Sequence, residues 1–157
     1  SRPRDHLNIH IVPKFIQPIE QWIADVLNGW TIPSPEDVRD HLAIPLLAQV
    51  NVDVGPAVWE LAEGRLGIKS EPQSVRVQSR RLGVTRARVY QLLDDCSKAI
   101  DVRWPDGGRR LAVLSKMFQA VRPGQEDLTL FNDTRNLFFP EKQQGDKDQR
   151  QPGAGVT

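Results

Sequence analysis

Arginine side chains gather in one short stretch of the chain. Between Pro72 and Leu93 the sequence holds five arginines and no acidic residue, although the whole chain of 157 residues carries a formal net charge of only +1. The five are Arg76, Arg80, Arg81, Arg86 and Arg88. Guanidinium groups donate to phosphate and carboxylate oxygens, and no neighbouring acid in this stretch competes for them. The stretch therefore predicts a surface that binds a polyanion, with an ordinary basic helix face as the alternative.

A turn-forming pattern divides this stretch into two expected helices. In "RLGVT", Leu82 is expected to close the apolar face of a short helix, and Gly83 to permit a tight turn. Val84 would fill the corner, and Thr85 would cap the next helix. That helix carries apolar residues at helical spacing, which are Val89, Leu92, Leu93, Cys96 and Ile100. The layout is typical of a helix-turn-helix, which presents the N-terminal residues of its second helix to the major groove of DNA.

The segment "RLGVTRARVYQL" resembles the helix-turn-helix of bacterial sigma factors, in the domain that reads the upstream promoter element (conserved region four). The preceding "ELAEGRLGIKSEPQSV" resembles the leading helix and loop of that domain, so the resemblance covers residues 57–104. It implies contacts to phosphates and base edges from the positions that match the family's motif, which are Thr85, Arg86, Arg88 and Gln91. Arg80 and Arg81, at the end of the first helix, would flank the DNA backbone.

Three departures from the family's pattern change what the resemblance implies. Ala87 stands where the family usually has a base-reading glutamate, so we expect an altered or looser sequence preference. Gln78 occupies a position that is usually apolar, which puts the packing of the first helix in question. Asp94 and Asp95 follow where the family usually continues basic, and they would repel phosphate near that part of the helix.

The rest of the chain is expected to supply supporting helices, because strand signals are nearly absent. We predict an all-α fold, a multi-helix bundle that contains the helix-turn-helix. The expected organisation is a flexible arm (1–14), an N-terminal helical unit (15–52), the sigma-like helix-turn-helix domain (53–104), a C-terminal helical extension (105–139) and a disordered tail (140–157). A helix should begin at Ser34 and Pro35, and Pro45 should end or kink it.

The segment "DVRDHLAIPLLAQV" could be a second copy of the motif. It aligns with "VQSRRLGVTRARVY" at an offset of 40 residues. Its Leu46, Leu47 and Ala48 stand where groove-facing residues would be, so this copy could not read DNA. A helical packing unit is the simpler interpretation. Arg109 and Arg110, close behind the motif in sequence, could touch backbone phosphates or belong to a solvated turn.

Other kinds of chemistry find little support in the sequence. His6, His10 and His41 have no acidic ligands at suitable spacing, so we expect no metal site. Cys96 is the only cysteine and falls on the apolar side of its helix, which favours a core role over a reactive thiol. Neither a phosphate-binding glycine loop nor a nucleophile motif is present. We therefore expect a protein without cofactor or enzymatic activity, cytoplasmic, and without a membrane span.

Two functions remain open at this point. The first is sequence-preferring binding of double-stranded DNA, in bacterial transcription or its regulation. The second is a sigma-like module that docks on RNA polymerase or another protein without reading DNA, which Ala87 and the Asp94–Asp95 pair would favour.

Overall fold

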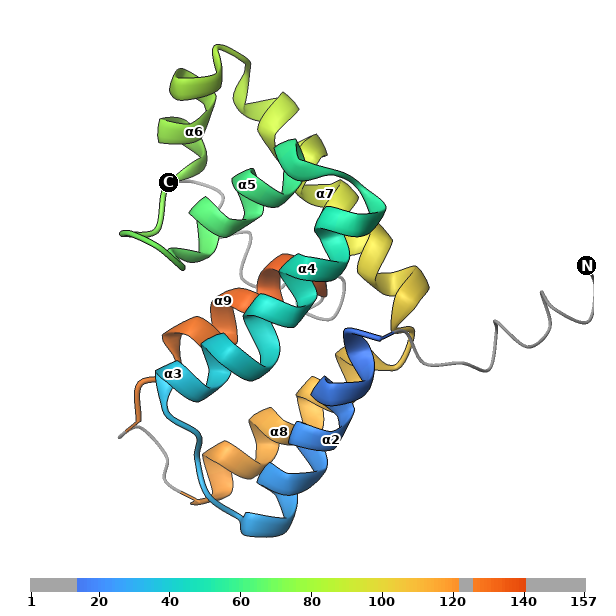
Figure 1. Cartoon of the computed structure of the whole chain (residues 1–157). Coiled ribbons are helices and arrows are strands. Elements are labelled where there is room, and N and C mark those ends of the chain that lie inside the picture. Colours follow the sequence, from blue (N-terminus) through green and yellow to red (C-terminus); the bar gives the residue numbers. More distant parts are fainter. Residues whose placement is uncertain (1–13, 122–125, 141–157) are drawn as a thin grey trace, which may run out of the picture.

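The structure is a computed structural model and describes residues 14–121 and 126–140. Every regular element in these ranges is a helix, so the all-α prediction is confirmed (Figure 1). In chain order they are α2 (Ile16–Gly29), α3 (Pro35–Val38), the π-helix η1 (Arg39–Ala43), α4 (Ile44–Asp53), α5 (Pro56–Leu66), α6 (Val75–Leu82), α7 (Arg86–Arg103), α8 (Gly107–Val121) and α9 (Thr129–Phe138). The predicted arm and tail lie outside the described residues, except for Lys14 and Pro140. No helix in the described part is long and apolar enough to cross a membrane.

The segment from Pro35 to Asp53 is helical throughout, in three consecutive elements. It begins as predicted: the Ser34 hydroxyl accepts a hydrogen bond from the Asp37 backbone N–H at 3.1 Å, and Pro35 occupies the first turn. Pro45 does not end the helix. The turn before it widens into the π-helix η1, in which the Ile44 N–H bonds to the Arg39 carbonyl five residues back. There is therefore no turn at the point that corresponds to Gly83, and the proposed second copy is a packing unit.

One large hydrophobic core joins most of the helices. Its members come from α2, α3, η1, α4, α5, the second half of α7, α8 and α9. The largest side chains with almost no exposed surface include Phe118, Phe131, Phe138, Ile19, Ile23, Leu42, Leu46 and Ile100. α2 packs against α8, and α9 packs against α3, α5 and α7. Burial of this apolar surface is the main contribution to the stability of the fold.

The α6–α7 pair extends beyond this core. In Figure 1, α6 and the start of α7 form the upper end of the molecule, while α2 and α8 lie at the lower end. The second half of α7 carries Cys96 and Ile100 into the large core. The first half carries Val89 and Leu93 into a separate small core under α6. One continuous helix therefore connects the projecting end to the body of the protein.

Candidate functional site

Local hydrogen bonds and one glycine define the start of α6 and the turn between α6 and α7. The Ser74 hydroxyl accepts from the Val77 N–H at 3.1 Å and caps the start of α6. Gly83 ends α6 with a φ of 70°, a left-handed conformation that glycine adopts without steric cost. The Thr85 hydroxyl accepts from the Arg88 N–H at 3.0 Å and caps α7. The two helices, the glycine turn and the threonine cap predicted from "RLGVT" are thus present.

A small core holds the pair to α5. It consists of four buried apolar side chains, Leu61, Val75, Val89 and Leu93. Leu92 and Leu137 pack against its edge. Because α5, α6 and α7 each contribute, the position of α6 depends on contacts that are far apart in sequence.

Gln78 packs into this region despite its polarity. Its side chain is fully buried, and its Nε2 donates to the Leu61 carbonyl at 2.9 Å and to the Gln73 Oε1 at 3.3 Å. Gly64 leaves the room for this, since a Cβ there would lie 3.1 Å from Gln78 Nε2 and 2.7 Å from Gln73 Oε1. The Oε1 of Gln78 has no hydrogen-bond partner among the described residues. The glutamine thus joins α6 to the backbone of α5 by a hydrogen bond from within the packed region.

Leu82 and Val84 do not have the roles expected from the sequence. Leu82 is 48% exposed and Val84 is 38% exposed, so neither closes the corner between the helices. Both residues lie at the α6–α7 tip, by which we mean α6, the turn and the first two turns of α7. The small core lies further from the turn than they do, and no other described element covers the turn (Figure 1). Val77, on the outward side of α6, is also 48% exposed. The tip therefore presents apolar side chains among its arginines.

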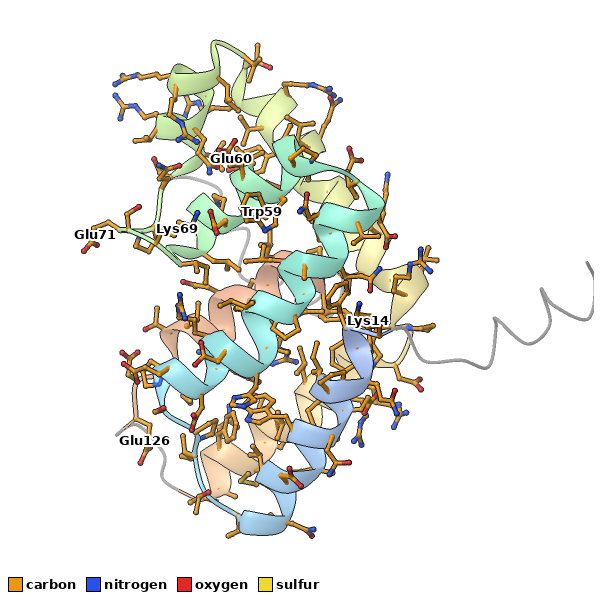
Figure 2. The ribbon with its side chains drawn as sticks, viewed as in Figure 1. Lys14, Trp59, Glu60, Lys69, Glu71 and Glu126 are labelled. Carbon is orange, nitrogen blue, oxygen red and sulfur yellow. The ribbon has the colours of Figure 1, made fainter. Side chains whose placement is uncertain are left out.

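The five arginines of the stretch are all exposed. Within the described residues none of them makes an ion pair, whereas Arg39, Arg103, Arg109 and Arg110 each pair with a carboxylate. Figure 2 shows nitrogen-tipped side chains projecting outward from α6 and from the start of α7. The labelled Lys69 behaves differently, because its ammonium lies 5.5 Å from the centre of the Trp59 ring and 3.7 Å from Glu63. The tip is therefore a concentration of uncompensated positive charge.

The residues singled out from the sequence fall on two parts of this tip. Arg80 and Arg81 lie in the last turn of α6, and Thr85 and Arg86 lie at the start of α7. The remaining two are one helical turn apart on α7 and touch: Arg88 Nη1 donates to the Gln91 Oε1 at 3.3 Å. This bond leaves the amide N–H groups of Gln91 and the other guanidinium N–H groups of Arg88 available as donors.

Tyr90 is an exposed residue that the sequence reasoning overlooked. It is 61% exposed and lies three residues after Ala87 on the same helix, about 60° away around the helix axis. It is one of several large apolar side chains that are exposed in the described residues, with Trp30 at 56% and Val102 at 77%, and it differs from them in its place on the first two turns of α7. The helical spacing that placed Ala87 and Gln91 on the outer side of α7 would have placed Tyr90 at its edge.

A groove runs along this edge of α7, between it and α9. Its volume is about 820 Å³, and it is lined by Arg65, Leu66, Pro72, Ala87, Tyr90, Gln91, Leu93, Asp94, Ser97, Asp133, Asn136, Leu137 and Pro140. Two carboxylates, those of Asp94 and Asp133, are among the lining residues, and Lys98 pairs with Asp94 at 3.1 Å. The one basic lining residue, Arg65, donates to the Gln73 carbonyl at 2.8 Å. A polyanion lying flat along α7 would meet these carboxylates. The arrangement instead favours an approach in which only the first two turns of α7 make contact.

The second half of α7 is fixed to the body by a strong ion pair. Arg103 donates through Nε and Nη2 to both carboxylate oxygens of Asp53, at 2.8 and 2.7 Å. The hydrogen bond from Arg103 lowers the pKa of Asp53, and Asp53 in turn raises the pKa of Arg103. Cys96 is fully buried, and this burial raises the pKa of its thiol to about 12, with a smaller contribution from the charge of Asp95. Its environment is that of a core residue.

Arg109 and Arg110 are engaged elsewhere. Arg109 lies 3.4 Å from Asp106, one turn earlier in the chain. Arg110 donates to Glu20 at 2.9 Å, and Trp104 Nε1 donates to the other oxygen of the same carboxylate at 2.6 Å. This cluster ties α8 to α2, so the Arg110 side chain is committed to the fold.

Comparisons with known proteins add no assignment: no protein-family profile, curated protein sequence or solved structure matches the chain. Among the described residues no three His, Cys, Asp or Glu side chains come together as a metal site would require. The α6–α7 tip remains the candidate because of its charge and geometry.

Proposed function

We propose that the α6–α7 pair is a helix-turn-helix that binds double-stranded DNA, with the sequence preference and the transcriptional role that its resemblance to sigma factors implies. One observation carries the proposal. Five exposed guanidinium groups without carboxylate partners lie on α6 and on the start of α7, on either side of a capped turn. By contrast, a carboxylate pairs with each of Arg39, Arg103, Arg109 and Arg110. Such a surface attracts phosphates, and a helix that enters it by its N-terminal end can reach base edges.

The positions of these residues on α6 and α7 give each of them an expected role in binding DNA. Thr85, Arg80 and Arg81 lie around the turn and would bind backbone phosphates. Arg86, Arg88 and Gln91 project from the first two turns of α7 and would reach the major groove. Asp94 marks the limit of the contact, since its carboxylate would repel phosphate beyond this point.

Binding of labelled duplexes at several salt concentrations tests the proposal. If the five arginines of the stretch together neutralise four or five phosphates, the logarithm of the affinity should fall against the logarithm of salt concentration with a slope of about −4 to −5. Arg86→Ala should weaken binding by about 1–3 kcal/mol and relax the sequence preference if its side chain reads a base. Arg39→Ala removes an arginine that is already paired with Asp40, and it should leave the affinity nearly unchanged. Absence of duplex binding at low salt, or equal losses in both variants, would contradict the proposal.

The exposed apolar side chains of the tip favour a second candidate function, docking on RNA polymerase or another protein. Val77, Leu82 and Val84 add uncovered apolar surface that phosphates would not use. Under this function Leu82→Ser with Val84→Ser should abolish binding to purified bacterial RNA polymerase, and Arg86→Ala should leave it intact. Under the DNA-binding function the serine variant should retain most of its duplex affinity.

A further inference from the structure

The outer side of the first two turns of α7 combines an apolar part and a hydrogen-bonding part. Around the helix the order is Tyr90, Ala87, Gln91 and Arg88, at about 100° per residue. Ala87 and Tyr90 are both exposed and line the same wall of the groove. A methyl group and an aromatic ring therefore lie together where a glutamate would otherwise supply an acceptor.

The hydrogen-bonding part offers mainly donors. Gln91 receives a hydrogen bond from Arg88 on its carbonyl oxygen at 3.3 Å, which occupies one of the two lone pairs of the acceptor that would bind the N6 amino group of adenine. Ala87 offers no acceptor to the exocyclic amino group of a cytosine or an adenine, and the nearest carboxylate, Asp94, lies one turn further along α7 and is paired with Lys98 at 3.1 Å. The Tyr90 hydroxyl is the other acceptor beside the apolar part. A thymine instead presents a carbonyl oxygen and a 5-methyl group at the same place in the major groove.

We propose that Ala87 and Tyr90 form a contact for the 5-methyl group of a thymine, so that this protein selects a site with a T·A pair at one fixed position. This inference rests on the proposed DNA binding and names what that same surface reads. Ala87 provides a flat, uncharged floor on which the methyl group lies, and the Tyr90 ring covers its side. Arg88 and Gln91 then donate to the acceptors of the neighbouring base or phosphate. Alanine at position 87, where the sigma-factor motif usually has glutamate, would thus give the protein a preference for thymine at this position of the site.

Replacement of thymine by deoxyuridine tests this directly, because it removes the methyl group and nothing else. Duplexes bound by the full chain are first selected from a random library, and each thymine of the selected site is then replaced in turn. Burial of one methyl group corresponds to roughly 0.8 kcal/mol, so one position should show about a fourfold loss of affinity. In Tyr90→Gln this loss should nearly vanish, and in Tyr90→Phe it should persist, because the ring and not the hydroxyl makes the contact.

The outcomes separate the two proposals. Since Tyr90 is 61% exposed, both substitutions should leave the helical circular dichroism spectrum and the melting temperature unchanged. If duplexes bind but no thymine position responds to deoxyuridine, the methyl contact is wrong and the DNA-binding function stands. A deoxyuridine loss of equal size in Tyr90→Gln assigns the methyl to another residue and also overturns the inference. If the full chain binds no duplex at low salt, both proposals fail together.

Discussion

Substitution of Asp53 by asparagine should destabilise the protein by about 1–2 kcal/mol at pH 7. Arg103 holds both oxygens of Asp53 at 2.7–2.8 Å, and the Asp53 side chain is only 13% exposed. A charge pair at about 4 Å and an effective dielectric constant of about 20 gains roughly 4 kcal/mol. Because the Arg103 side chain is 45% exposed, solvent screening and side-chain ordering remove more than half of this. Asparagine keeps one acceptor for Gln49, whose Nε2 donates to Asp53 at 2.9 Å, so this contact is largely retained.

The pH dependence gives the same prediction a second test. The pKa of Asp53 is lowered from its ordinary value of 3.8, mainly by the hydrogen bond from Arg103. The stabilisation should therefore be fully present well above pH 3.8 and be lost as the pH falls through the lower folded-state pKa. Urea unfolding at pH 7 and at several values below 4 should show the difference between wild type and Asp53→Asn shrinking.

A matched control isolates the geometry of the pair. Asp40 pairs with its sequence neighbour Arg39 at 2.8 Å, and both side chains are about half exposed. Asp40→Asn should change the free energy of unfolding by less than about 0.5 kcal/mol. If Asp53→Asn costs no more than this control, or if its cost stays constant down to the lowest pH, then the ion pair does not anchor α7 as described.

Three further expectations concern single residues. Gly67 and Gly83 both have positive φ, at 73° and 70°, but a Cβ on Gly67 would lie 2.6–2.8 Å from Pro72 and one on Gly83 would meet nothing within 4 Å. Urea unfolding should therefore show Gly67→Ala losing roughly 2–3 kcal/mol and Gly83→Ala only about 1 kcal/mol; equal losses would contradict the crowding. Cys96, with its pKa raised to about 12, should not react with a thiol reagent at pH 8 until the protein is unfolded. Asp94→Asn should raise duplex affinity about two- to fivefold at low salt, and this gain should disappear at high salt.

The local elements of the tip were predictable because their causes lie within one helical turn. Gly83 and Thr85 act on residues three or four positions away, and the sequence displays both partners together. The packing of the tip was not predictable in the same way. Leu82 has the right spacing to be buried, but whether another element covers it depends on where α5 ends in space. The spacing of apolar residues shows which side of a helix is apolar, but it does not show how much of that side is buried by other helices.

Long-range polar contacts limited the prediction of the site in a similar way. Arg110 looked available next to the motif, but its partner Glu20 stands 90 positions earlier in the chain. Gln78 looked unsuited to its place, and its partner is a backbone carbonyl that every residue type possesses, so the sequence carries no signal for it. Residue types therefore indicated which side chains could bind an anion, while the fold decided which of them remain unpaired.

The continuity of α7 has a mechanical consequence. Its first half carries the tip, and its second half is embedded in the large core and anchored by Arg103. A load applied at Arg86 cannot be absorbed by a hinge, since no residue between it and Arg103 leaves the helix. A ligand that clamps the tip should therefore slow amide hydrogen exchange far from the contact, along the buried half of α7. Because α7 is continuous, binding of a ligand at the tip would thus change the stability of the helix within the large core.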